Sequence, residues 1–249
     1  MKRVISLINL KGGVGKTTTA IEMGYLLSAR YKTRVLLVDN DKQGNLSRAL
    51  GVYQGDTYCG TAKLMDGQQA VPQPTRIAGC DVISANMTLL TATYKSKGHP
   101  NGYQQLRRIA DREGKPYQFI IIDNPPDLGI NVLNALFVSQ DVIVPTKIDQ
   151  WALEGLDVIR DQVQEIRKLN QGLHEPMALV TMYRNTPANA AGVEWLRDNG
   201  YKHYNTMIRY SDKAVENTFL GQAIQEYSPR SAAALSYRKF IGEYLESVK

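Results

Sequence analysis

Apolar residues occur along the chain in short continuous runs, separated by longer stretches in which they recur every three or four positions. The runs are rich in Val, Ile and Leu, which is typical of strands buried on both faces of a parallel sheet. Strands are predicted at Arg3–Asn9, Arg34–Asn40, Cys80–Asn86, Phe119–Asn124, Asp141–Lys147, Met177–Tyr183 and Tyr204–Arg209. The pattern therefore predicts a mainly parallel, twisted sheet.

The stretches between the runs have the spacing of helices that bury one face. A helix is predicted from about Gly15 to Arg30, and the C-terminal stretch from Tyr237 to Val248 has the same spacing. A further helix places one set of apolar residues on a common face: Leu153, Leu156, Ile159, Val163 and Ile166. This alternation predicts a single three-layer α/β domain over residues 1–249, with helices on both faces of the sheet.

Composition limits the class of protein without identifying it. The chain has 249 residues, of which 43% are hydrophobic and 22% charged, as in ordinary globular domains. Its two cysteines and three histidines show no metal-ligand spacing. No apolar run reaches the roughly 18 residues of a membrane helix, so a cytoplasmic protein is expected. The net charge of +6 permits contact with nucleic acid or an acidic membrane surface.

A glycine-rich segment, KGGVGKTT, follows the first predicted strand and opens the first predicted helix. Its glycines let the backbone curl and point several N–H groups at one spot, where the helix N-terminus adds further donors. We expect a nucleotide to be bound by Lys11, Gly12, Gly13, Val14, Gly15, Lys16, Thr17 and Thr18. The order of strand, glycines, lysine, threonine and helix therefore predicts a phosphate-binding loop.

Three residues of this loop have specific expected roles. Lys16 would contact the β- and γ-phosphates, the Thr17 hydroxyl would ligate Mg²⁺, and Thr18 would donate to the α-phosphate. The common pattern G-x-x-x-x-G-K-[ST] is broken, because Leu10 stands where it has its first glycine. The segment is the deviant Walker A form of a P-loop NTPase, and it predicts ATP and Mg²⁺ as ligands.

Lys11 is a second lysine at the entry to the loop, five residues before Lys16. From there its side chain points away from the phosphates of its own loop. A second copy facing the first across two nucleotides could receive that charge during phosphoryl transfer, as it would from an arginine finger. Lys11 therefore predicts an ATP-dependent homodimer, and the alternative is a solvated surface lysine.

Three acids follow apolar strands at the sheet edge where the loop also lies. Asp123 is the expected partner of Mg²⁺, in the Walker B position. Asp41 is placed to polarise the attacking water, and Asp39 to support the metal site. Each could instead be a structural cap. The stiff turn Asn124–Gly129 could change position with the nucleotide state, or could be a plain connection.

Four stretches carry a resemblance to a known family: KGGVGKTT (Lys11–Thr18), VDNDKQGNLS (Val38–Ser47), IIIDNPPDLG (Ile120–Gly129) and VIVPTKIDQWALEGL (Val142–Leu156). With them the chain resembles the ParA/MinD family of P-loop ATPases, and its ParA branch more closely. The segment Gly221–Phe240 resembles the C-terminal end of that family. The resemblance therefore covers nearly the whole chain.

The resemblance implies a catalytic cycle. ATP drives formation of a sandwich dimer, which binds DNA without sequence preference. A ParB-type centromere-binding protein, or an analogous adaptor, stimulates hydrolysis, and plasmid or chromosome DNA is positioned over the nucleoid. Lys11, Lys16 and Asp41 would be the catalytic residues. Tyr183 and Asn185 occupy the segment that lies near the adenine in relatives. No helix-turn-helix precedes the first strand, so sequence-specific DNA binding is not expected.

A basic surface is the expected DNA contact. The candidates are Arg184, Lys202, Arg209, Lys213, Arg230, Arg238 and Lys239. The segment Ile208–Lys213, IRYSDK, departs from the I-P-R-N of many relatives at this place.

Other functions stay open at this point. A MinD-like ATPase would bind membrane through an amphipathic tail, and Tyr237–Val248 could form such a face, although stable membrane association is not expected. A carboxysome or other protein cargo would use the same ATPase. Iron–sulfur relatives need paired cysteines, and a metabolic kinase needs an acceptor site and an ordinary Walker A loop.

Overall fold

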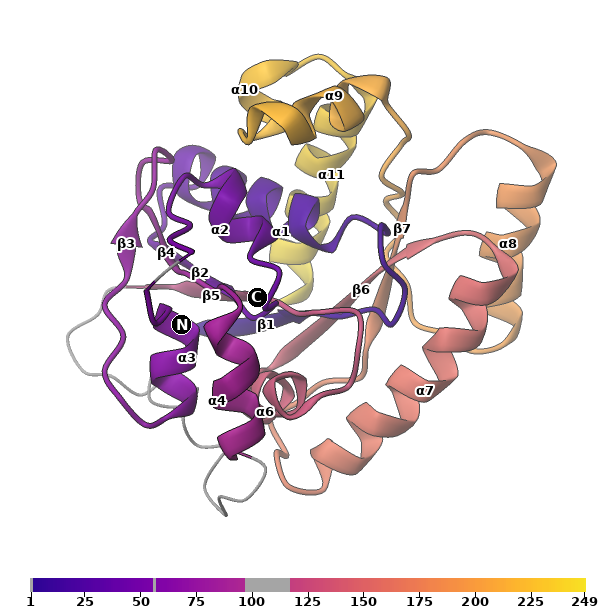
Figure 1. The fold of residues 1–249 in the computed structure, drawn as a ribbon. Helices are drawn as coiled ribbons and strands as arrows, with labels where there is room; N and C mark the ends of the chain where they lie inside the picture. The colour runs from indigo at the N-terminus through magenta and orange to yellow at the C-terminus, as the bar shows by residue number, and fades with distance from the viewer. Residues whose placement is uncertain (1, 56, 97–116) are drawn as a thin grey trace.

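The computed structural model describes residues 2–55, 57–96 and 117–249 (Figure 1). Within them, one sheet has the strand order β3-β4-β2-β5-β1-β6-β7. The strands are β1 (Arg3–Leu7), β2 (Val35–Asp39), β3 (Gln73–Pro74), β4 (Cys80–Ile83), β5 (Phe119–Asp123), β6 (Asp141–Lys147) and β7 (Met177–Thr181). The pairs are parallel, except that the short edge strand β3 runs antiparallel to β4.

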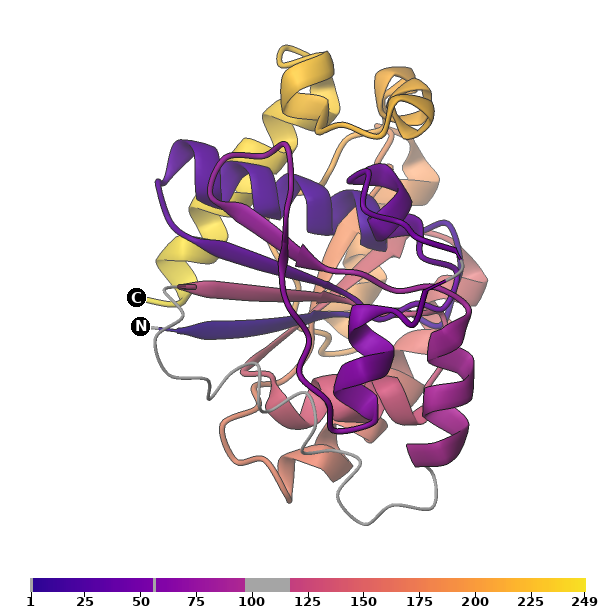
Figure 2. The ribbon, with the colours of Figure 1, turned by 60° about the vertical axis from the view of Figure 1, so that its left-hand side comes forward.

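Helices cover both faces of this sheet (Figures 1 and 2). They are α1 (Lys16–Tyr25), which continues into the π-helical turn η1 (Leu26–Arg30), α2 (Asn45–Ala49), α3 (Gly60–Met65), α4 (Thr88–Ser96), α6 (Ile130–Val138), α7 (Gln150–Arg167), α8 (Pro187–Asp198), α9 (Asp212–Leu220), α10 (Ile224–Tyr227) and α11 (Ala232–Ser247). Helices α1 and α11 lie on one face, and α6 and α7 on the other. The predicted three-layer α/β domain is confirmed.

The continuous apolar runs are explained by hydrophobic cores on both faces of the sheet. Ile5 and Leu37 pack against α1 and α11 in one core. Their neighbours Val4 and Leu36 point to the opposite face and pack in another core with α3 and α6. Successive strand residues thus serve opposite layers, so neither face of a central strand can be polar.

The predicted strand Tyr204–Arg209 is wrong as a continuous strand. The segment lies beside β7, with isolated bridges at Ala178↔His203 and Tyr183↔Arg209 and a backbone bond from the Ile208 amide to the Val180 carbonyl at 2.8 Å. Between these bridges, the backbone amides of Asn205 and Thr206 donate to the Glu243 carboxylate of α11, at 2.7 and 2.9 Å. At these two residues a side-chain acceptor therefore takes the place of the β7 backbone, and the ladder is interrupted.

The predicted helical faces are buried. On α7, Leu156, Ile159, Val163 and Ile166 lie in the core with β6 and β7, while the side chain of Leu153 lies outside the described part. On α11, Tyr237, Phe240, Ile241 and Tyr244 are 0–2% exposed. This face of α11 is filled by the core, which excludes it as a lipid-binding face. In the described part of the chain, no helix has the length and apolarity required to cross a membrane.

The strand order brings the candidate chemistry to one edge. Strand β5 lies between β2 and β1, and the register pairs Asp123 with both Asp39 and Leu7. The connection from β1 to α1 leaves the sheet beside these carboxylates. The carboxyl ends of β1, β2 and β5 therefore form the floor of the site.

Candidate functional site

The loop between β1 and α1 has the conformation of a phosphate cradle. Gly13 and Gly15 have φ values of 73° and 90°, in the left-handed region where a side chain would be strained. Gly15 is the N-cap of α1, so the free N–H groups of the first helical turn face the loop. The Thr181 hydroxyl at the end of β7 donates to the Val14 carbonyl at 2.9 Å and anchors the loop from outside.

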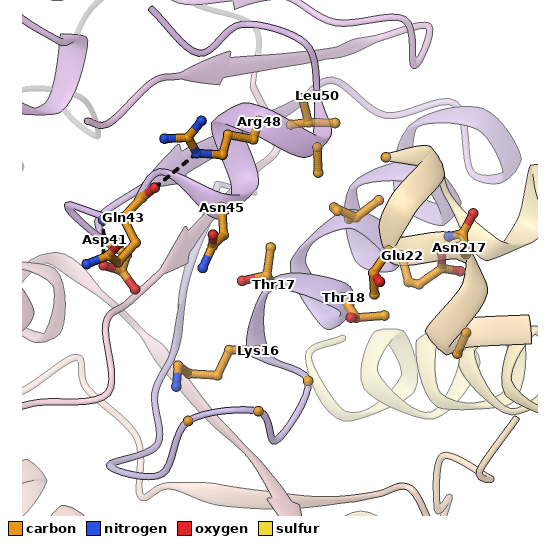
Figure 3. Close-up of a pocket in the computed structure, with 18 of the residues that line it drawn as sticks. Lys16, Thr17, Thr18, Glu22, Asp41, Gln43, Asn45, Arg48, Leu50 and Asn217 are labelled. Carbon is orange, nitrogen blue, oxygen red and sulfur yellow. Dashed lines mark hydrogen bonds between the residues drawn. The ribbon is translucent and has the colours of Figure 1, made fainter. Parts of the chain in front are cut away.

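The loop opens into a hollow of about 1160 Å³, large enough for a nucleoside triphosphate (Figure 3). Its walls come from the loop, α1, α2, the turn after β5, and α9. Of the residues predicted to bind nucleotide, those that line it are Gly12, Gly13, Gly15, Lys16, Thr17 and Thr18. Val14 is 1% exposed, so its side chain belongs to the core and only its backbone can take part.

Lys16 lies in this hollow, and its Nζ is held by backbone carbonyls. It donates to the carbonyls of Asn9 and Lys11, at 3.1 and 3.2 Å. Burial lowers the pKa of the Lys16 ammonium, and the carboxylates of Asp123 and Asp41 oppose this shift. A bound phosphate would supply the negative charge that two neutral carbonyls do not.

Asp123 is a buried acid beside the loop. It is 2% exposed, and its Oδ1 is a buried atom without a hydrogen-bond partner among the described residues. Burial raises the pKa of Asp123 to about 8, the nearby Asp39 carboxylate adds to the rise, and a hydrogen bond from the Thr17 hydroxyl opposes it. A divalent cation would compensate this oxygen, so Thr17 and Asp123 fit the predicted Mg²⁺ site.

Asp39 is engaged by hydrogen bonds from the segment that follows it. It is fully buried, its Oδ2 accepts from the Ser47 amide and hydroxyl at 2.8 and 2.6 Å, and its Oδ1 accepts from the Asp41 amide at 3.2 Å. Both oxygens are therefore engaged, and the residue does not line the hollow. Asp39 anchors α2 and the Asp41 segment, and its predicted support of the metal site stays a prediction. Burial raises its pKa to about 6.

Asp41, two residues on, does line the hollow. Its Oδ1 accepts from the Gln43 amide at 2.9 Å, which fixes the carboxylate in a local turn. Figure 3 shows Asp41 on the wall formed by the segment before α2, apart from Lys16 on the loop. This position suits the predicted role of orienting a water molecule.

Lys11 is held by its own chain. Its Nζ lies 2.7 and 2.6 Å from the two carboxylate oxygens of Asp149, between β6 and α7. The Lys11 side chain remains 35% exposed, and the residue does not line the hollow. This geometry agrees with the prediction that the Lys11 side chain points away from the phosphate site of its own loop. The contact with a second copy stays a prediction.

The predicted base contacts Tyr183 and Asn185 do not line the hollow, and Met182 does. Met182 has a φ of 53°, an uncommon conformation for a residue with a side chain. The reversal after β7 directs the next residue, Tyr183, against the α7 core. Met182 is therefore the residue of this segment that reaches the hollow, and a base contact by Tyr183 or Asn185 stays a prediction.

Several lining residues were not predicted, among them Glu22, Asn45, Arg48 and Asn217 (Figure 3). The helical period could have marked Glu22, because it lies one turn after Thr18 on α1. Asn217 belongs to α9, roughly two hundred residues from the loop, and no local pattern signals its place.

The candidate DNA-binding residues do not form one uniform face. Arg184, Arg209, Lys213, Arg230 and Lys239 are exposed. Lys202 lies at the other end of β7, where its carbonyl accepts from the Ala178 amide, and its Nζ pairs with Glu175 at 2.7 Å. The structure therefore separates Lys202 from the rest.

Arg238 also differs from the prediction. It is half-buried, donates to Gln225 Oε1 at 3.1 Å, and donates to the Pro229 carbonyl. These contacts tie α11 to the α10 region, and a DNA contact by Arg238 stays a prediction. At the carboxyl end of β7, Arg184 stacks over the Tyr210 ring at 3.7 Å, and Lys213 pairs with Glu216 at 2.8 Å.

Comparison with known proteins identifies a matching family model and similar proteins. A family model described as an AAA domain matches residues 2–175. The chromosome-partitioning ATPase Soj of Thermus thermophilus is 36% identical over 250 residues, which cover 99% of this chain and 97% of that protein. The chromosome partitioning protein ParA of Caulobacter vibrioides is 32% identical over 255 residues, covering 98% of this chain and 94% of that protein.

Solved structures with the same fold cover the whole chain. Cobyrinic acid a,c-diamide synthase from Mycobacterium smegmatis, with a bound ATP analog and magnesium, has a TM-score of 0.85 at 27% identity, covering 100% of this chain and 96% of that one. The cell division ATPase MinD of Pyrococcus furiosus has a TM-score of 0.76 at 21% identity and full coverage of both chains, which is a likeness of fold alone.

Proposed function

Because the chain belongs to the ParA/MinD family of P-loop ATPases, we propose that it is a partition ATPase. It hydrolyses ATP to ADP and phosphate with Mg²⁺, forms an ATP-sandwich dimer, and binds DNA without sequence preference. The observation that carries the proposal is the combination of a P-loop lysine inside the hollow with a second lysine held outside it. Three relatives of more than 30% identity are named as chromosome-partitioning proteins.

The loop and its helix bind and orient the triphosphate. Backbone N–H groups of the loop and of the first turn of α1 hold the phosphate oxygens, and Lys16 exchanges its two carbonyl partners for the terminal phosphates. Mg²⁺ would neutralise charge on these phosphates when bound. Thr17 and Asp123 would hold it, directly or through water.

Asp41 orients the attacking water. It lines the hollow, and its anchoring to Gln43 leaves the other carboxylate oxygen to accept from that water. Phosphoryl transfer depends mainly on positioning of the reactants and on charge stabilisation. The Asp41 carboxylate, fixed by its own turn, positions the attacking water.

Lys11 supplies the charge stabilisation from a second copy. In the single chain its ammonium is neutralised by Asp149 at a partly exposed site. A pair of this kind is typically worth about 0.2–1 kcal/mol, so a triphosphate can displace Asp149 at little cost. Each copy then completes the site of the other, and hydrolysis requires the dimer.

The dimer binds DNA through basic residues beyond the nucleotide site. Arg230 and Lys239 serve as test candidates, because both are exposed and, unlike Arg184 and Lys213, have no ring or carboxylate partner among the described residues. Contacts with phosphates alone give strong salt dependence and no base preference. A ParB-type protein or an analogous adaptor stimulates turnover and releases the dimer. In the cell this ATPase would be associated with the nucleoid and would position plasmid or chromosome DNA.

A gel-shift titration tests the DNA part of the proposal. With ATP and Mg²⁺, duplexes of unrelated sequence should be retarded equally, and affinity should fall steeply as salt increases. Replacement of Arg230 and Lys239, singly, by Ala should weaken retardation, while Lys202→Ala, at the far end of β7, serves as a control of equal charge change. Absence of retardation at low salt would contradict DNA binding.

A further inference from the structure

Three buried asparagines join the two strand ends that carry the candidate acids. Asn40 follows Asp39 at the end of β2, Asn124 follows Asp123 at the end of β5, and Asn131 lies in the first turn of α6. They are 0%, 1% and 7% exposed, respectively. We call these residues, Asn40, Asn124 and Asn131, the amide cluster.

The amide cluster is directly hydrogen-bonded. Asn40 Nδ2 donates to Asn124 Oδ1 at 2.8 Å and to the Asn131 carbonyl at 2.9 Å. Asn131 Nδ2 donates back to the Asn40 carbonyl at 2.8 Å. Asn124 Nδ2 donates to the Leu7 carbonyl at 3.0 Å, which extends the network to the end of β1.

The amide cluster begins where the sheet ladder ends. The last paired residues of β2 and β5 are Asp39 and Asp123. Beyond them, one backbone bond, from the Asn40 amide to the Asp123 carbonyl at 2.9 Å, continues the contact, and the side chains then take over. Without these side-chain bonds, the segments that follow β2 and β5 could diverge at this point.

The segments that emerge from the amide cluster both reach the nucleotide hollow. Asp41 follows Asn40 directly, and the turn Pro125–Asp127 follows Asn124 directly. Both line the hollow. An apolar pair could fill the same space, but it would not fix direction, whereas each amide bond fixes distance and orientation together.

We propose that the amide cluster is a positioning device, which holds Asp41 in register with the turn that follows Asp123. Asn40 and Asn131 do not line the hollow, and the side chain of Asn124, which does line it, is already hydrogen-bonded through both its oxygen and its nitrogen. The cluster makes the water-orienting carboxylate and the phosphate-facing turn move as one body, so that Asp41 is correctly placed only when the turn is. This inference rests on the proposed ATPase function and on the role of Asp41 in it.

The test compares turnover with nucleotide affinity in single and double variants. Asn40→Ala and Asn124→Ala should each lower kcat on the order of 10- to 100-fold, because small misplacements of a positioned group are costly. Affinity for a non-hydrolysable ATP analogue should stay within about threefold, since the loop contacts are retained. The double variant should lose no more than the worse single variant, because the pair acts as a unit.

Asn134→Ala is the matched control. Asn134 is also fully buried on α6, but its Nδ2 donates to the Ile130 carbonyl within the same helix. This variant should lose stability and keep kcat. If Asn40→Ala does not fold, Asn131→Ala removes only the bond to the Asn40 carbonyl and should show the same split between kcat and affinity.

Two failures are distinguishable. If the wild type hydrolyses ATP and the amide-cluster variants keep kcat, or lose it no more than Asn134→Ala does, the inference is overturned. The ATPase function is then still supported. A wild-type chain that binds the analogue and never hydrolyses ATP, with Mg²⁺ and duplex DNA present, would overturn the proposed function and this inference with it.

Discussion

Replacement of Glu22 by Gln should make the protein progressively more stable than wild type as pH rises. Glu22 lies on α1 within the nucleotide hollow and is 1% exposed. Its oxygens accept from the Ile224 amide and from Gln225 Nε2, which ties α1 to α10. Burial raises the pKa of Glu22 from its ordinary 4.5 to about 7. The two hydrogen bonds lower this pKa, but they offset only part of the rise.

The sign follows from proton linkage. Between these two pKa values the folded chain holds a proton that the unfolded chain has released, so stability decreases with pH and levels off above about 7. At about 1.4 kcal/mol per pKa unit, the full loss is roughly 3 kcal/mol. From about pH 5.5 to about pH 8 roughly 2 kcal/mol of it should be observed. The glutamine side chain of the variant does not titrate and avoids this loss.

Urea unfolding without nucleotide, repeated across this pH range, measures the effect as the difference between variant and wild type. Other buried acids, such as Asp39 and Asp123, contribute to both proteins and cancel in the difference. Glu194→Gln, at an exposed position on α8, makes the same change of residue type away from Glu22 and should give a flat difference. A Glu22→Gln difference that stays flat or decreases with pH would mean that Glu22 is ionised in the folded state, and would refute the reasoning.

Three further predictions concern the nucleotide site. Lys16→Ala should abolish ATP binding measured by calorimetry, because the cradle loses its charge, and retained binding would contradict the assignment. Thr17→Ala should keep nucleotide binding but need much more Mg²⁺ for turnover; an unchanged Mg²⁺ requirement would exclude Thr17 as a ligand. Asp41→Ala should still dimerise with ATP in light scattering, with turnover reduced on the order of 100-fold; a monomer at saturating ATP would argue against the sandwich.

The sheet and the phosphate loop could be predicted from the sequence because their signals are local. A strand such as Asp141–Lys147 is a continuous apolar run, and its predicted and observed bounds coincide. Lys16 and Thr17 follow glycines whose conformations no other residue adopts easily, so their place is fixed by spacing. Asp41 reaches the hollow, and Asp123 lies beside the loop beneath it, because parallel strands end at one edge.

The features that the sequence could not signal come from contacts between distant segments and from an uncommon backbone conformation. Tyr204–Arg209 has the composition of a strand, and Glu243, some forty residues on, takes its backbone amides. Tyr183 lies against the core because Met182 adopts a left-handed backbone that its residue type does not signal. Asp39 follows its strand as Asp123 does, and only the fold shows that Ser47 engages it.

Mixing two inactive variants tests the exchange of Lys11 between copies most directly. In a mixed dimer of Lys11→Ala and Asp41→Ala, the Lys11→Ala copy keeps its own Asp41 and receives Lys11 from its partner, so one site is complete. Equal mixing should restore about a quarter of the wild-type ATP turnover, since half of the dimers are mixed and each has one working site. Turnover no higher than that of the separate variants would show that Lys11 acts within its own chain or not at all, and would contradict the account.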